Sequence, residues 1–196
     1  MVNDSEIDGE IDTLILGIGN VLWADEGFGV RCVETLNARF DFDANVRLMD
    51  GGTQGMFLLP WVSSVSRLLI FDAIDFGLVP GDLRIMRDDE VPQYMGAKKI
   101  SMHQTGFQEV LMSARLLSDR PQQLALVGVQ PELLDDYGGS LREVVRRRIP
   151  DAVAQACTVL REWGVGFRER EEPLAIIDLI GPGELDIASY ELGRPR

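Results

Sequence analysis

The chain has 196 residues, of which 45% are hydrophobic, so it can form one domain with a sizeable core. Its formal net charge of −13 argues against nonspecific binding to nucleic acid, because such binding depends on basic residues that neutralise phosphates. No apolar run approaches the roughly 20 residues that span a bilayer, and the acidic segment 1–12 lacks the basic start and apolar core of a secretory signal. We therefore expect a cytoplasmic protein without a membrane span.

The first predicted unit is a strand, a glycine-containing loop and a helix. A short aliphatic run at 14–16 is typical of a buried strand and ends in a loop that begins at Gly17. Apolar residues at helical spacing follow over 27–40. The loop carries two acids, Asp25 and Glu26. One could cap the helix; we assign the cap to Asp25 and a place in the ligand crevice to Glu26, although spacing alone leaves this open.

The rest of the chain alternates between strand and helix patterns. Strands are predicted at 46–49, 67–71, 83–86 and 123–129, with 83–86 as an edge or antiparallel strand. Helices are predicted at 54–65 (weakened by Pro60), 105–117 and 141–163 (with a break at Pro150), and a loop at 88–101. Such alternation predicts a mainly parallel sheet that is covered on both faces.

Acidic residues follow three of the predicted parallel strands. Glu26 follows the first, Asp50 ends the second at a point where Asp-Gly-Gly cannot readily continue a strand, and Asp72 ends the third. His103, the only histidine, stands just before a helix and can reach the same edge of the sheet. This arrangement outlines a metal site. Each residue also has a plainer interpretation: a turn for Asp50, a turn or cap for Asp72, and a structural or exposed imidazole for His103.

Other chemistries find little support in the motifs. The first loop has GxG but Leu22 at the third glycine position of a dinucleotide fingerprint, and the chain has no phosphate loop, GxSxG elbow or HExxH zinc motif. Cys32 and Cys157 each lie in a helical pattern and are predicted to be buried thiols, not a disulfide. The basic run 142–148 indicates a solvated helix face, or a contact for an acidic partner.

Five motifs in order carry a family resemblance: GIGNVLWADEGFGVR, LMDGGTQGMFLL, LLIFDAIDFG, ISMHQTG and LVGVQPE. The chain resembles the [NiFe]-hydrogenase maturation endopeptidases, which remove a C-terminal peptide from the hydrogenase large subunit once nickel has been inserted. The likeness covers 13–164, which leaves an acidic lead at 1–12 and an extension at 165–196. It implies a three-layer α/β/α fold with a twisted, mainly parallel sheet of about five strands.

The resemblance also implies roles for individual residues. Glu26, Asp72 and His103 match the metal-binding and catalytic residues of the family, and the segment Asp50, Gly51, Gly52 and Thr53 matches an element that we assign to substrate binding. The implied partner is a [NiFe]-hydrogenase large-subunit precursor, whose nickel the enzyme recognises on the substrate and holds weakly by itself. A monomer is expected. The alternative from another class is a nickel-dependent maturation chaperone that binds the precursor without cutting it.

The extension contains two patterns. The charged run 168–172 is predicted to be a solvated linker, and the apolar run 174–180 a strand or a docking segment. The extension could pack on its own domain or contact the cognate large subunit.

Overall fold

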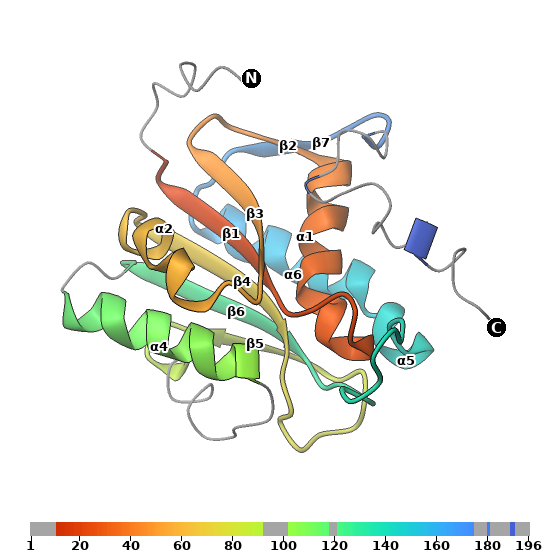
Figure 1. The fold of residues 1–196 in the computed structure, drawn as a ribbon. Helices are drawn as coiled ribbons and strands as arrows, with labels where there is room; N and C mark the ends of the chain where they lie inside the picture. The colour runs from red at the N-terminus through yellow and green to blue at the C-terminus, as the bar shows by residue number, and fades with distance from the viewer. Residues whose placement is uncertain (1–10, 92–101, 118–120, 175–179, 181–188, 191–196) are drawn as a thin grey trace, which may run out of the picture.

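A five-stranded sheet forms the centre of the molecule, in the spatial order β3–β1–β4–β6–β5 (Figure 1). The structure, a computed structural model, describes residues 11–91, 102–117, 121–174, 180 and 189–190, and leaves the side chains of 102–105 undescribed. Strands β1 (Thr13–Ile18), β3 (Val46–Gly52), β4 (Arg67–Ala73) and β6 (Gln123–Val129) run parallel. β5 (Leu83–Arg87) is the antiparallel edge strand, as predicted.

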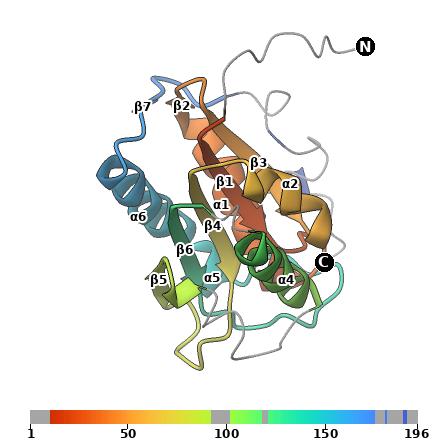
Figure 2. The ribbon, with the colours of Figure 1, turned by 90° about the vertical axis from the view of Figure 1, so that its left-hand side faces the viewer.

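Helices cover both faces of the sheet, which confirms the predicted three-layer α/β/α fold (Figure 2). Helices α1 (Phe28–Arg39) and α6 (Ile149–Glu162) pack on one face, and α2 (Leu59–Ser63) and α4 (Met102–Leu116) on the other. Each layer buries its own hydrophobic cluster against the sheet. Cys32 in α1 and Cys157 in α6 are free and buried, as expected for packing thiols.

Two strands extend further than the sequence indicated. β3 was predicted to stop before Asp50, but it continues to Gly52 because Asp50 pairs with Gly17 and Gly52 pairs with Ile18. The register shifts between these two pairs, so Gly51 is accommodated as a bulge residue. β4 likewise includes Asp72, which pairs with a residue of β6. The acids therefore lie in the last positions of the strands, where the sheet constrains their direction.

Three helix predictions require correction. His103 lies in the first turn of α4, not before it. The segment predicted as one helix at 54–65 divides into the 3₁₀ turn η2 (Gly55–Leu58) and α2, with Pro60 in the first turn of α2. The segment 141–163 divides at 147–148 into α5 (Glu143–Arg146) and α6, and Pro150 again lies in a first turn. Proline starts these helices because the first turn needs no N–H donor.

A second, two-stranded sheet joins β2 (Phe40–Phe42) to β7 (Phe167–Glu169). Neither strand was predicted. The prediction of a solvated linker at 168–172 is wrong for residues 168 and 169, which belong to β7. The rings of Phe40 and Phe167 pack edge to face with their centroids 5.7 Å apart, and Arg168 and Arg170 both form ion pairs with Asp41. Beyond β7, Ile180 packs against the core, whereas 175–179, most of the second predicted segment, lies outside the described residues. None of the described helices is long and apolar enough to cross a membrane.

Candidate functional site

Glycines bring the start of α1 into backbone contact with the ends of β1 and β4. A Cβ atom on Gly29 would lie 2.2 Å from the carbonyl oxygen of Phe71, and one on Gly17 would lie 2.4 Å from the carbonyl oxygen of Gly29. Gly19 has a φ of 126° and packs against the backbone of Glu26. A Cβ atom added to Gly19 would lie 1.8 Å from the carbonyl oxygen of Glu26, so no side chain fits there. The loop that carries Glu26 is therefore held directly over the carboxyl ends of the central strands.

Glu26 lies in the 3₁₀ turn η1 (Ala24–Gly27) that leads into α1, and its side chain is half-buried. Burial, with a smaller contribution from the negative charge of Asp135, raises the pKa of Glu26 from 4.5 to about 7. The structure thus places Glu26 at the predicted edge of the sheet, in an environment that opposes its ionisation.

Asp72 occupies the end of β4 and is fully buried. Its Oδ1 accepts a hydrogen bond of 2.8 Å from the amide of Ala73, whereas its Oδ2 has no hydrogen-bond partner among the described residues. Burial raises the pKa of Asp72 well above its usual range; the Ala73 amide opposes this effect and the nearby Glu26 reinforces it. A buried acceptor atom without a partner is costly, and a bound cation would satisfy it. Asp72 and Glu26 therefore fit a cation site.

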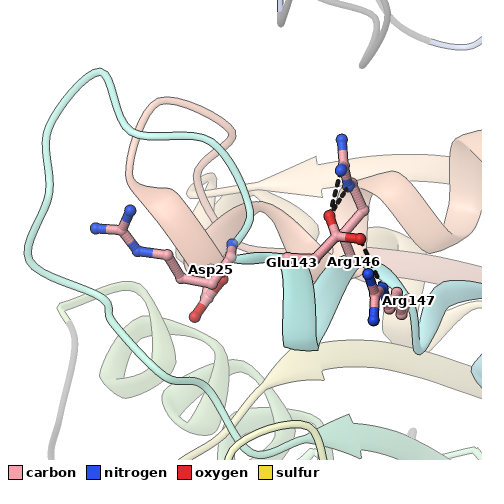
Figure 3. Close-up of polar contacts among 5 residues, drawn as sticks. Asp25, Glu143, Arg146 and Arg147 are labelled. Carbon is pink, nitrogen blue, oxygen red and sulfur yellow. Dashed lines mark hydrogen bonds and ion pairs between the residues drawn. The ribbon is translucent and has the colours of Figure 1, made fainter.

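Asp25 has a different role from the helix cap that we predicted. The cap residue of α1 is Gly27, and no side chain caps it. The fully buried carboxylate of Asp25 instead accepts three backbone hydrogen bonds from the loop after β6: Oδ2 from Glu132 and Leu133 at 2.8 and 2.9 Å, and Oδ1 from Arg142 at 2.7 Å. Figure 3 shows the carboxylate of Asp25 beside the start of α5. Asp25 joins the Glu26 turn to the 131–142 loop.

The predicted substrate-binding segment borders the same edge of the sheet. Burial raises the pKa of Asp50, while a backbone hydrogen bond from Gly52 and the charge of Arg31 lower it, and the buried Oδ1 of Asp50 has no partner in the described part of the chain. Gly51 is buried against Ile18, whereas Thr53 is exposed. Asp50 is thus more than a turn acid, and Thr53 is open to a ligand.

The helix turn that carries His103 lies near this edge of the sheet. Gly106, one turn further along α4, lies beside Gly55 of η2, so that a Cβ atom added to Gly106 would be in van der Waals contact with the Gly55 Cα at 3.5 Å. The first turn of α4 therefore lies beside the end of β3. The side chain of His103 is outside the described residues, and the described side chains alone contain no group of three His, Cys, Asp or Glu residues placed to hold a metal.

Gln130 is a residue of this edge that the sequence interpretation missed. Its Oε1 accepts hydrogen bonds from the amides of Phe76 and Leu78 at 2.8 and 3.1 Å, and its Nε2 donates to Asp75 at 3.0 Å. It thereby orders the loop after Asp72. Two signals were available: Gln130 is a polar residue directly after the apolar run of β6, and it lies in the LVGVQPE motif, to which no role was assigned.

The basic run 142–148 is paired with acids of the chain itself. Glu143 forms ion pairs with Arg146 and Arg147 (Figure 3), and Arg148 pairs with Asp151 at 2.6 Å. The two arginine hydrogen bonds lower the pKa of Glu143. These exposed contacts agree with the first of the two interpretations of this run, a solvated helix face.

Fold and site together define a class. The protein is an α/β/α protein with a carboxylate pair at the carboxyl ends of parallel strands, which is where open α/β folds bind their ligands.

The particular family within this class follows from comparison with known proteins. A family model described as HycI, hydrogenase maturation protease, matches residues 30–159. The chain belongs to the hydrogenase maturation protease family and is a peptidase, in agreement with the resemblance of its motifs. This membership favours the enzyme over the non-cleaving chaperone.

Curated relatives and solved structures agree with that assignment. The hydrogenase expression/formation protein HoxM of Cupriavidus necator is 55% identical over 180 residues, which are 92% of this chain and 89% of the relative. The hydrogenase 2 maturation protease of Escherichia coli is 43% identical over 81% of this chain and 96% of its own length. The structure of the hydrogenase maturating endopeptidase HybD of E. coli superposes with a TM-score of 0.77 at 41% identity, over 81% of this chain and 98% of that chain.

Proposed function

We propose that this peptidase removes the C-terminal peptide of a [NiFe]-hydrogenase large-subunit precursor after nickel has been inserted, and that it recognises the nickel ion on the precursor. Membership of the hydrogenase maturation protease family supports the reaction and the class of substrate. The observation that carries the nickel part is the buried Oδ2 of Asp72, which has no hydrogen-bond partner within the described part of the chain and lies near a second carboxylate, Glu26.

The candidate ligands suit an ion that arrives already bound elsewhere. Glu26, Asp72 and His103 supply at most two carboxylates and one imidazole, which leaves coordination positions for groups of the precursor. Oxygen and nitrogen ligands do not by themselves select nickel over neighbouring divalent ions. Selectivity therefore comes from the precursor, and the free enzyme holds the metal weakly.

The remaining residues position the substrate. In this proposal the Glu26 turn and the end of β4 hold the ion against the edge of the sheet, while Asp50, Gly51, Gly52 and Thr53 hold the tail of the precursor. Nickel bound to the precursor would supply Lewis acidity at this edge of the sheet, and either the metal or a carboxylate would polarise the scissile carbonyl or activate the attacking water. The backbone contacts at Gly19 and Gly29 keep the two carboxylates in place during this step.

A processing assay tests the proposal. The large-subunit precursor from the same organism, nickel-loaded and nickel-free, is incubated with the protein and analysed by mass spectrometry. We expect a C-terminal peptide to be lost only from the loaded precursor. Loss from both forms would retain the protease and contradict nickel recognition. Nickel-dependent complex formation without cleavage would instead support the non-cleaving chaperone.

Replacement of His103 by Ala is the sharpest variant for the ligand assignment. We expect His103→Ala to abolish processing with little change in thermal stability, because the residue lies in the first turn of α4, where Ala is readily accommodated in the helix. Glu109→Ala, an exposed position on the same helix, is the control and should process normally. Normal cleavage by a folded His103→Ala variant would refute the role of His103 as a ligand.

A further inference from the structure

Two strongly exposed aromatic side chains lie on turns at the carboxyl edge of the sheet, on either side of the candidate site. Phe57 in η2 is 83% exposed and Tyr137 in the loop after β6 is 71% exposed. Single exposed apolar residues are common on protein surfaces. These two differ because each belongs to a turn that is tied by hydrogen bonds to a segment of the candidate site.

The Phe57 turn continues directly from the substrate-binding segment. The amide of Gln54 donates to the carbonyl of Gly51 at 3.1 Å, and the amide of Phe57 donates to the carbonyl of Gln54 at 3.3 Å. Gly55 has a φ of 54°, which a side chain would disfavour, and it touches α4 next to the turn that carries His103. Phe57 is therefore displayed between the end of β3 and the start of α4.

Tyr137 packs on the segment that leads into the Glu26 turn. Its ring packs on Trp23, three residues before Glu26, with the ring centroids 5.3 Å apart. Trp23 also forms isolated β-bridges with Tyr137 and Gly139, and the amide of Ala24 donates to the carbonyl of Gly139 at 2.9 Å. The loop after β6 thus presents Tyr137 in a defined orientation toward solvent.

We propose that Phe57 and Tyr137 are docking anchors for the body of the hydrogenase large-subunit precursor, on the two sides of its entering tail. This inference rests on the proposed function. A protein substrate whose scissile bond reaches Glu26 and Asp72 has to lie across the turns that flank them, so these are the first surfaces it meets. Aromatic side chains held rigidly lose little conformational entropy on binding, and they are enriched among residues that dominate interface energies.

The chain contains a matched control. Leu116 is 84% exposed, as much as Phe57, but it lies at the end of α4 opposite His103, roughly 20 Å along the helix at 1.5 Å per residue. Removal of an exposed apolar side chain there tests the general effect of surface apolarity. Tyr137→Phe retains the ring and serves as the conservative variant.

Two measurements test the docking anchors. The first is the dependence of cleavage rate on the concentration of nickel-loaded precursor. We expect Phe57→Ser and Tyr137→Ser each to raise KM about tenfold with kcat within about twofold of the wild type. Leu116→Ser should leave both constants unchanged, and Tyr137→Phe, which keeps the ring, should recover most of the affinity that Tyr137→Ser loses. The second is the Kd for nickel-free precursor, measured in the His103→Ala background, in which we expect the same fold-changes.

The outcomes separate this inference from the function on which it rests. Absence of cleavage by the wild type would overturn the proposed function, but weaker binding by the two serine variants would still support the anchors. Cleavage with unchanged KM and Kd in both serine variants would overturn the anchors alone. An equal effect of Leu116→Ser, or a loss confined to kcat, would also overturn them.

Discussion

Asp25 offers the most direct test of how the site is built, because an isosteric change removes its function as a triple acceptor. Its carboxylate accepts amide hydrogen bonds from Glu132, Leu133 and Arg142 at 2.7–2.9 Å, in full burial. In Asp25→Asn the amide oxygen can replace only one of the two carboxylate oxygens. The NH₂ group then faces at least one N–H donor that has lost its acceptor, on the inner side of a partly buried contact.

The magnitude follows from these contacts. One buried donor left unsatisfied costs about 1–3 kcal/mol, and the remaining hydrogen bonds lose the strength that an ionised acceptor gives them. We therefore expect Asp25→Asn to lower the free energy of unfolding by about 2–4 kcal/mol, which corresponds to a Tm about 5–15 °C lower for a domain of this size.

The assay is thermal unfolding followed by circular dichroism, with Asp135→Asn as the control. Asp135 lies in the same loop but is exposed, so its replacement should change Tm by no more than about 2 °C. The reasoning is refuted if Asp25→Asn unfolds within about 2 °C of the wild type, because the three hydrogen bonds would then contribute nothing that an amide cannot replace.

Two further predictions concern Glu26 and the C-terminal extension. The pKa of Glu26 is raised from 4.5 to about 7, so its ionisation destabilises the fold as pH rises through this range. Glu26→Gln should therefore have near wild-type stability at pH 4.5 and be more stable than the wild type by about 1–2 kcal/mol at pH 8. The pKa shift alone corresponds to about 3 kcal/mol, and solvent screening at this half-buried side chain reduces that value. A stability difference in chemical denaturation that does not vary with pH would contradict this prediction. Truncation after Arg170 removes the packing of Ile180 against the core and the backbone hydrogen bond that the amide of Leu174 donates to the carbonyl of Ala38. We therefore expect Tm to fall by about 2–6 °C. The folded, truncated protein should still process the precursor. Lost processing at unchanged Tm would instead indicate that the extension contacts the precursor.

The sequence predicted the architecture well where patterns are local. The buried runs that became β1, β4 and β6 and the helical pattern of α1 are recognisable because burial dictates their residue types. β2 and β7 were missed because three residues each are too few for a period, and their pairing joins segments far apart in the chain. The extension of β3 through Asp50, Gly51 and Gly52 was missed because local turn preference was overridden by pairing with β1.

The candidate site was predictable only where local sequence patterns determine it. Strand ends placed Asp72 at the carboxyl edge of the sheet, and the structure agrees. The division of roles between Asp25 and Glu26 was not predictable from spacing, because it depends on amides of Glu132, Leu133 and Arg142 more than a hundred residues away. The ligand role of His103 stays a prediction.

The glycine contacts at Gly17, Gly19 and Gly29 have a consequence for how the protein can change over evolutionary time. Because main chain touches main chain there, the spacing between the Glu26 turn and the end of β4 does not depend on how neighbouring side chains pack. A substitution elsewhere in the chain that leaves these three glycines and their backbone contacts in place therefore leaves that spacing unchanged, whereas any side chain at one of the three would change it.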